Sequence, residues 1–303
     1  MTNAETAFVT LGTPGRRIRV ARWLPETAAP RATVLVFNGL SEFIEKYEEV
    51  AADLLKRNLA VLSLDWGGQG LSDRLLPNRH KIHTVDYVDR LDEVDALIAW
   101  GKETLGELPT VVLAHSMGGH IALRYVAERS VPRLAAFALS APMVSIRYPS
   151  WLVRPLSNLV SGLGFSERYP PFYGDYNYDQ TVGIPNTVTS DRTRGMVQHD
   201  AILNNHGLAV GNITWGWMRA SQASISHLKQ PGVLEKIIVP TIFGMAGKEM
   251  LVSNDAIKRA VARIPNADLI ELPGSRHEIL MERDEFRAPF FNAFDQLLTK
   301  AGL

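Results

Sequence analysis

The chain contains no cysteine among its 303 residues. It therefore cannot form a disulfide, bind a metal through thiolates or use a cysteine nucleophile. Its 32 Lys and Arg residues balance 32 Asp and Glu residues, so no basic field is available to attract nucleic acid. No apolar run reaches the ~18 residues that cross a membrane, and the N-terminus lacks a signal-peptide pattern. We therefore expect a cytoplasmic protein with no nucleic-acid partner.

Short apolar runs alternate with amphipathic stretches along the first half of the chain. The runs, which fit strands buried on both faces of a parallel sheet, are 33–37, 60–64, 110–113 and 135–139. Helical patterns lie between them, at 46–59, 85–104 and 117–128. Residues 17–24 alternate polar and apolar, as an outer antiparallel strand does. This order predicts the α/β class, with a doubly wound, mostly parallel sheet.

The alternation stops after Ala141 and returns near residue 233. The segment between is rich in Tyr, Trp, Pro, Gly and Asn and has helical fragments at 151–163 and 191–205. Strand and helix patterns then follow at 237–243, 255–264, 268–272 and 283–298. Because an ordinary connection is far shorter, we predict three parts. They are a core over 1–143, an inserted, mainly helical lid over 144–232, and the rest of the core over 233–303.

Ser116 stands where an apolar strand turns into a helix, in the stretch TVVLAHSMGGH over 110–120. So tight a strand–turn–helix connection needs small residues two before and two after the serine, and Ala114 and Gly118 hold these places. The turn exposes the hydroxyl at the carboxyl end of the sheet and at a helix N-terminus, where free N–H groups stabilise negative charge. We predict that Ser116 is a catalytic nucleophile.

A serine hydroxyl attacks only when a base takes its proton. His277 lies in the loop between the last predicted strand and the last helix, which is where the base belongs in a Ser–acid–His chain order. The acid belongs in the loop after the 237–243 strand, which offers Glu249 and Asp255. Asp255 begins a helix and is interpreted as a cap, so Glu249 is the predicted acid, with Asp255 as the alternative.

The oxyanion that forms during acyl transfer needs backbone donors. The N–H of Met117, directly after the serine, is one predicted donor. The second is the N–H of Leu40, in the loop after the 33–37 strand, where Gly39 allows the backbone to approach the substrate. Asn38 and Gly39 in this loop, together with Trp215 in the insertion, are predicted to contact the substrate.

Three stretches resemble the lysophospholipase and monoacylglycerol lipase branch of the α/β-hydrolases. They are NGLSEFIEKY over 38–47, LDWGGQGLSD over 64–73 and HSMGG over 115–119. The family usually has His before the first glycine, Arg where Gly67 stands, and Asp where Glu249 stands. The resemblance covers nearly the whole chain. It implies hydrolysis of a carboxylic ester through an acyl-enzyme, on a lysophospholipid or a monoacylglycerol. No Asp/His cluster in the sequence has metal-ligand spacing, so we expect no metal, and we expect no cofactor.

Other functions stay open at this point. A small-ester carboxylesterase is the nearest alternative, and the triad also suits a thioester, an amide or a lactone. A non-catalytic ligand receptor on the same scaffold is a further alternative, since fold alone does not determine function. The insertion's aromatic residues predict an apolar lid over Ser116. Apolar residues within 146–163 are interpreted mostly as the lid's own core, with peripheral membrane contact by part of this helix as the sharper hypothesis.

Overall fold

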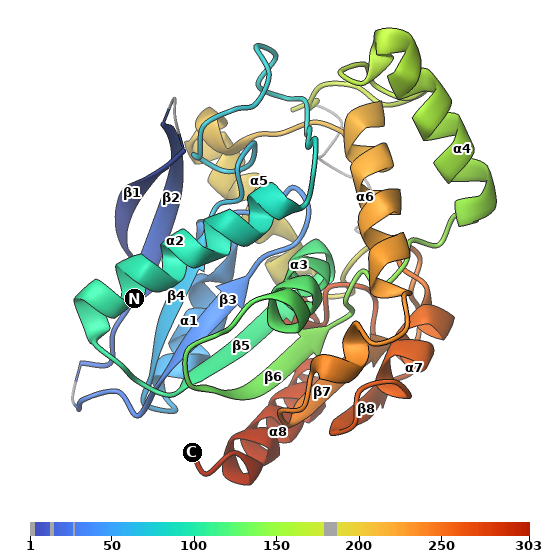
Figure 1. Ribbon diagram of the computed structural model, residues 1–303. Coiled ribbons are helices and arrows are strands. Elements are labelled where there is room, and N and C mark those ends of the chain that lie inside the picture. The colour runs from blue at the N-terminus through green and yellow to red at the C-terminus, as the bar shows by residue number, and fades with distance from the viewer. Residues whose placement is uncertain (1–3, 13–14, 27, 179–186) are drawn as a thin grey trace.

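An eight-stranded sheet with the order β1-β2-β4-β3-β5-β6-β7-β8 forms the centre of the protein (Figure 1). The computed structural model describes residues 4–12, 15–26, 28–178 and 187–303. The strands are β1 (Glu5–Leu11), β2 (Arg16–Trp23), β3 (Ala32–Phe37), β4 (Leu59–Leu64), β5 (Thr110–His115), β6 (Leu134–Ser140), β7 (Thr241–Ala246) and β8 (Ala267–Leu272). The β1–β2 and β2–β4 pairs are antiparallel and the other pairs are parallel. The predicted α/β fold class is confirmed.

Helices cover both faces of this sheet. The α-helices are α1 (Glu48–Leu55), α2 (Val88–Leu105), α3 (Ser116–Glu128), α4 (Ser150–Val160), α5 (Arg192–Asn204), α6 (Trp215–Leu228), α7 (Asn254–Val261) and α8 (Asp284–Lys300). Apolar residues of α1 and α8 pack on one face, and those of α2, α3 and α7 pack on the other. Every residue of β3 and β4 is buried, as the continuous apolar runs predict.

Short helical turns complete the connections. They are η1 (Ile44–Tyr47), η2 (Ser161–Phe165), η3 (His206–Leu208), η4 (Leu234–Lys236) and η5 (Ile279–Met281). None of the helices within the described ranges is long and apolar enough to cross a membrane.

Two strands differ from the sequence prediction. β1 was not predicted; it is an edge strand, half-exposed, that pairs only with β2. β7 begins at Thr241 rather than at residue 237. Pro240 explains the shift, because proline has no N–H to donate to the ladder of a central strand.

The insertion between β6 and β7 contains α4, η2, α5, η3 and α6. α4 packs against α6 and lies at the outer side of the molecule in Figure 1. Much of its apolar surface is uncovered: Trp151 is 78% exposed and Leu159 is 61% exposed. The interpretation that most of these residues form the lid's own core is therefore wrong.

Candidate active site

Ser116 occupies a strained turn between β5 and α3. Its φ is +51°, a left-handed value that L-residues seldom adopt outside functional turns. A Cβ at Gly118 would lie 2.4 Å from the carbonyl oxygens of Phe37 and Asn38, so this position accepts only glycine without rearrangement. Ala114 is fully buried. The requirement for small residues on either side of Ser116 thus has a direct steric cause.

His277 connects Ser116 to Glu249 through two hydrogen bonds. Its Nε2 lies 2.8 Å from Ser116 Oγ, and its Nδ1 lies 2.7 Å from Glu249 Oε2. In the tautomer with a proton on Nδ1, the histidine donates to the carboxylate and accepts from the serine hydroxyl. The side chains of His277 and Glu249 are only 5% and 2% exposed. The three residues therefore form one hydrogen-bonded chain that is shielded from bulk water.

Glu249 is held by its own loop. Its Oε1 accepts the backbone N–H groups of Met250, Leu251 and Val252 at 2.9, 2.7 and 3.2 Å. Burial alone would raise the pKa of Glu249, but the bonds from His277 and from the backbone outweigh burial and lower it. The carboxylate is consequently ionised and fixed beside the imidazole.

Asp255, the alternative acid, does not contact His277. It is exposed in the first turn of α7. The N-cap of this helix is Ser253, whose hydroxyl accepts the N–H of Ala256, so the interpretation of Asp255 as the cap is wrong.

The insertion holds the loop that carries His277. The N–H of Glu278 donates to the carbonyl of Val188 at 2.8 Å, and the Arg276 guanidinium donates to the carbonyl of Thr189 at 3.1 Å. Residues on both sides of His277 are therefore bound to the same short stretch of the insertion. This anchoring was not foreseen, because it joins segments almost ninety residues apart.

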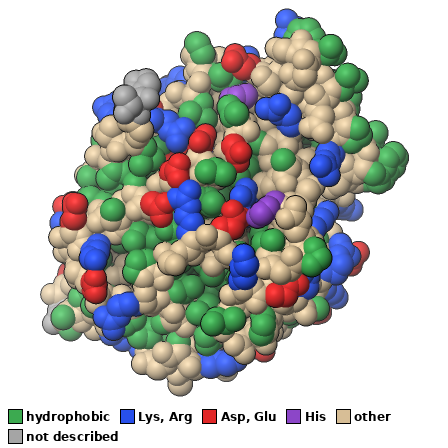
Figure 2. All heavy atoms as spheres, in the orientation of Figure 1, with side chains coloured by type: hydrophobic (Ala, Val, Ile, Leu, Met, Phe, Trp, Pro, Cys, Tyr) green, Lys and Arg blue, Asp and Glu red, His purple; other side chains and the backbone are tan. Residues whose placement is uncertain are grey.

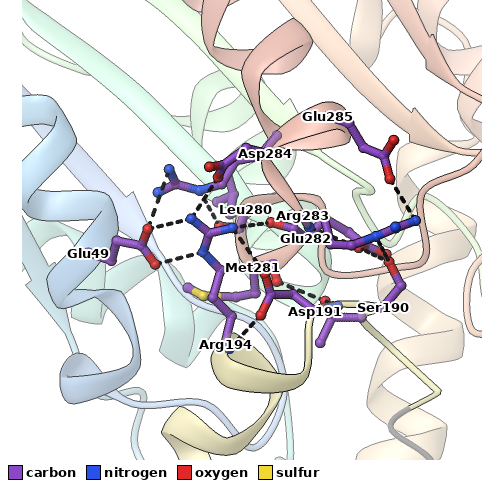
Figure 3. A network of polar contacts seen from close by, with 12 residues as sticks. Glu49, Ser190, Asp191, Arg194, Leu280, Met281, Glu282, Arg283, Asp284 and Glu285 are labelled. Carbon is purple, nitrogen blue, oxygen red and sulfur yellow. Dashed lines mark hydrogen bonds and ion pairs between the residues drawn. The ribbon is translucent and has the colours of Figure 1, made fainter.

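A polar network extends this anchoring to the core (Figure 3). Arg194 on α5 donates to Glu49 on α1 at 2.7 and 2.8 Å, to Asp284 at 2.7 Å and to the carbonyl of Glu282 at 2.7 Å. The buried Glu282 carboxylate accepts Ser190 Oγ at 2.5 Å and the N–H of Arg276 at 2.9 Å. The network ties α5 to the segment that follows His277.

The two predicted oxyanion donors are unoccupied by other bonds. Within the described part of the chain, the N–H groups of Leu40 and Met117 find no acceptor. Met117 is the second residue of α3, where N–H groups have no partner within the helix. The loop that carries Leu40 is braced by Gln69, whose side chain accepts the Ser41 N–H at 2.8 Å and donates to the Gly39 carbonyl at 3.3 Å.

A cavity of about 410 Å³ opens over Ser116. Apolar side chains from the loop after β6, from α6 and from the loop after β7 make up much of its wall: Met143, Ile146, Trp217, Met218, Leu251 and Val252. Polar groups beside His277 make up another part: Ser41, Glu42, His115, Gln198 and Glu278. Ser221 and Gln222 of α6 also line the cavity, among the apolar residues of the wall. A pocket with a mainly apolar wall and a group of polar side chains beside His277 suits an amphipathic ligand.

The substrate contacts predicted for Asn38, Gly39 and Trp215 need correction, because none of these residues lines the cavity. The Asn38 amide is used inside the core, where it donates to the Leu64 carbonyl at 2.6 Å. Trp217, two residues after Trp215, provides the aromatic wall instead. Burial distinguishes the two, since Trp217 belongs to the buried core cluster and Trp215 is only half-buried.

A mostly parallel sheet of this order, with a serine on a positive-φ turn hydrogen-bonded to a histidine and a carboxylate from later loops, defines an α/β-hydrolase. The particular family follows from the sequence. The family model described as serine aminopeptidase, S33, matches residues 28–284, and the chain belongs to this family.

Known relatives cover most of the chain. It is 29% identical over 283 residues to a probable lysophospholipase L2 of Haemophilus influenzae, and the aligned region covers 90% of this chain and 85% of that protein. It is 30% identical over 277 residues to lysophospholipase L2 of Escherichia coli, and the aligned region covers 86% of this chain and 78% of that protein. A soluble variant of monoglyceride lipase from Saccharomyces cerevisiae, solved with a substrate analogue, has the same fold, with a TM-score of 0.74 and 15% sequence identity. The superposition covers 99% of this chain and 97% of that chain.

Proposed function

We propose that Ser116, His277 and Glu249 are the catalytic triad of this carboxylic ester hydrolase, and that its substrate is a single-chain lipid ester. The observation that carries the proposal is the hydrogen-bonded chain from Ser116 through His277 to Glu249 at the base of an amphipathic cavity. The relatives named lysophospholipase support the substrate class.

The first step forms an acyl-enzyme. His277 Nε2 takes the hydroxyl proton of Ser116 as Oγ attacks the ester carbonyl carbon. The carbonyl oxygen becomes an oxyanion, which the N–H groups of Leu40 and Met117 stabilise. Loss of one such donor costs about 3–4 kcal/mol of transition-state stabilisation. The imidazolium, stabilised by Glu249, then gives its proton to the leaving alcohol as the C–O bond breaks.

The second step hydrolyses the acyl-enzyme and regenerates the free enzyme. His277 takes a proton from a water molecule, and the resulting hydroxide attacks the acyl carbon of the acyl-Ser116 ester. Collapse of the tetrahedral intermediate breaks the bond to Oγ, and His277 returns the proton to Ser116. The products are the alcohol, a carboxylic acid and the free serine.

A matched acyl series tests this proposal. Wild type and Ser116→Ala are compared on p-nitrophenyl esters from short to long acyl chains, on a monoacylglycerol and on a lysophosphatidylcholine. Ser116-dependent hydrolysis of the long-chain lipids is the expected result. Hydrolysis restricted to short esters would instead identify a small-ester carboxylesterase, and equal fluorophosphonate labelling of both proteins would refute Ser116 as the nucleophile.

The exposed face of α4 supports a proposed contact with a lipid surface. Trp151, Leu152, Leu156 and Leu159 are 78%, 51%, 43% and 61% exposed, and Figure 2 shows hydrophobic side chains gathered at the edge where α4 lies. Tyr148, just before this helix, lines the cavity and is 64% exposed. Tyr148 therefore connects the exposed apolar residues of α4 with the cavity lining along the chain, and we propose that a single-chain lipid enters from this side.

Vesicle co-sedimentation tests this contact. The double variant Trp151→Ser, Leu159→Ser is expected to lower the bound fraction several-fold. Ile238→Ser is the matched control, because Ile238 is also exposed (68%) but lies before β7, away from the insertion. If wild type co-sediments with vesicles only at the background level, the proposed contact with a lipid surface is refuted. That the protein is cytoplasmic stays a prediction from the sequence.

A further inference from the structure

The polar wall of the cavity has an unusual charge pattern. Glu42 and Glu278 both line the cavity, and none of its described lining residues is a lysine or an arginine. Carboxylates that line a cavity whose lining holds no cation disfavour an anionic ligand and favour groups that donate hydrogen bonds. The charge of this wall therefore bears on which ester the site accepts.

Both carboxylates belong to the part of the cavity lining near His277. The leaving oxygen must receive its proton from His277 Nε2. Glu278 follows His277 directly in the chain. Glu42 lies 3.9 Å from His115 Nε2, and the His115 ring centroid is 4.8 Å from that of His277. Because the leaving oxygen is protonated by His277, we take this part of the cavity to be the one that receives the alcohol part of the ester.

Lys46, the cation bonded to both carboxylates, has an acceptor for each of its N–H donors. Lys46 Nζ is bonded to Glu42 at 2.7 Å, to Glu278 at 2.6 Å and to Gln198 at 3.2 Å, and its side chain is 3% exposed. An ammonium has three N–H donors, and all three have acceptors here. Burial would lower the pKa of Lys46, but the two carboxylates raise it, so the ammonium stays charged and paired. It has no donor left for a phosphate.

The net charge of this cluster is zero or negative. Burial opposes ionisation of Glu42, but Lys46 and His115 hold its pKa at about 2, so Glu42 is ionised and cancels Lys46. Burial, together with the charge of Glu42, raises the pKa of Glu278, which adds either no charge or a negative one. In neither state does the cluster attract an anion.

Hydrogen-bonding capacity is nevertheless free on this wall. Lys46 donates to Oε1 of Glu278, and Oε2 of Glu278 accepts no hydrogen bond from any residue that the structure describes. The Ser41 side chain also lines the cavity. Carboxylate and hydroxyl oxygens are suited to the hydroxyl groups of a polyol.

We infer that the alcohol side of the cavity accepts an uncharged, hydroxyl-bearing headgroup and disfavours a phosphate, so that a monoacylglycerol is hydrolysed in preference to a lysophospholipid. Glu278 is the residue that determines this specificity. The inference rests on the proposed function, because it concerns the leaving group of the same reaction.

The test compares esters with one acyl chain and different alcohols. Lauroylglycerol, lauroyl-lysophosphatidylcholine and lauroylcholine are presented in the same detergent micelles, and kcat/KM is measured for each. We expect kcat/KM for the glycerol ester to exceed that for the lysophospholipid at least tenfold in wild type, since burying a phosphate with no cation to pair with it typically costs more than the free energy of a tenfold change.

Two variants of the cluster sharpen the test. Glu278→Gln removes the ionisable carboxyl group and keeps the shape, and Glu278→Lys introduces a positive charge. Both are expected to lower the glycerol-to-phosphate ratio, the lysine more strongly. Because the ratio is taken within one variant, a loss common to both substrates cancels. Glu271→Gln, which removes an exposed carboxylate on β8, is the matched control and should keep the wild-type ratio.

The outcomes separate this inference from the proposed function. Equal rates, or a preference for the lysophospholipid or for lauroylcholine in wild type, overturn the inference while the triad stands. A wild-type ratio above ten that does not change in either Glu278 variant overturns the role of Glu278. Loss of Ser116-dependent hydrolysis for every ester, p-nitrophenyl esters included, refutes the proposed function itself.

Discussion

Exchange of Glu249 for glutamine tests the triad with almost no change in side-chain shape. Three backbone N–H groups, of Met250, Leu251 and Val252, point at Oε1 of this residue. An amide NH₂ cannot accept these bonds, so the amide oxygen of the glutamine must take the Oε1 position. The NH₂ group then faces His277 Nδ1.

This orientation reverses the imidazole. His277 Nδ1 must now accept a hydrogen bond, so the ring proton moves to Nε2, which lies 2.8 Å from Ser116 Oγ. Nε2 can no longer take the serine proton. We expect kcat to fall roughly 10³–10⁴-fold, which corresponds to about 4–5 kcal/mol on the barrier. KM should change little, because Glu249 does not line the cavity.

The assay is steady-state hydrolysis of p-nitrophenyl butyrate, with the rate of fluorophosphonate labelling as a second measure of serine reactivity. Thermal unfolding checks that the variant is folded. The control is Asp255→Asn, the alternative acid, which is exposed in the first turn of α7 and should keep wild-type kcat. A Glu249→Gln protein with more than a tenth of wild-type kcat would refute the reasoning. A large loss of kcat in Asp255→Asn would identify Asp255 as the catalytic acid instead.

Three further predictions follow from the site and its surroundings. Gly118→Ala should lower the free energy of unfolding by about 1–3 kcal/mol, because the new Cβ would meet the carbonyl of Phe37 at 2.4 Å; chemical denaturation measures this. Arg194→Ala should lower kcat about tenfold or more with KM nearly unchanged, because displaced catalytic groups lose rate rather than binding; the exposed neighbour Arg192 provides the control Arg192→Ala. Acidification should destabilise the protein, because burial lowers the pKa of His115 to about 4 and that of His120 to about 3.

The sign of the pH effect follows from proton binding. Both histidines are neutral in the folded protein and protonate near pH 6.5 once unfolded. The unfolded state therefore binds more protons below pH 6.5, and stability falls as pH is lowered from 6.5 toward 4, by about 2 kcal/mol for each histidine at pH 5. Urea unfolding at pH 7 and pH 5 measures this change. Equal stability at the two pH values would contradict this prediction. A Gly118→Ala protein with the free energy of unfolding of wild type would contradict the first prediction, and an Arg194→Ala protein with wild-type kcat would contradict the second.

Local features of the sequence determined the parts of the site that depend on a few neighbouring residues. The tight turn at Ser116 follows from small residues on either side of it, and the strands follow from continuous apolar runs. Because strands of a parallel sheet end at one edge, the loops that follow them bring Ser116, Glu249 and His277 together. The Ser–acid–His order along the chain was therefore enough to predict Ser116 and His277 and to favour Glu249 over Asp255 as the acid.

Tertiary structure decided what depends on contacts between distant segments. The choice of Trp217 over Trp215 for the cavity wall is set by the rotation of α6 about its axis, which places Trp217 in the buried core cluster. The exposed face of α4 has the same kind of origin, since the apolar pattern of a helix does not say whether a partner covers it.

The charge cluster in the cavity shows this difference most clearly. Glu42 and Lys46 are four residues apart, but Glu278 joins them from the other end of the chain. Each of these residues, taken alone in the sequence, is typical of a solvated surface. Only folding removes them from water, and the desolvation of paired charges is what turns ordinary surface residue types into a wall that can discriminate between headgroups.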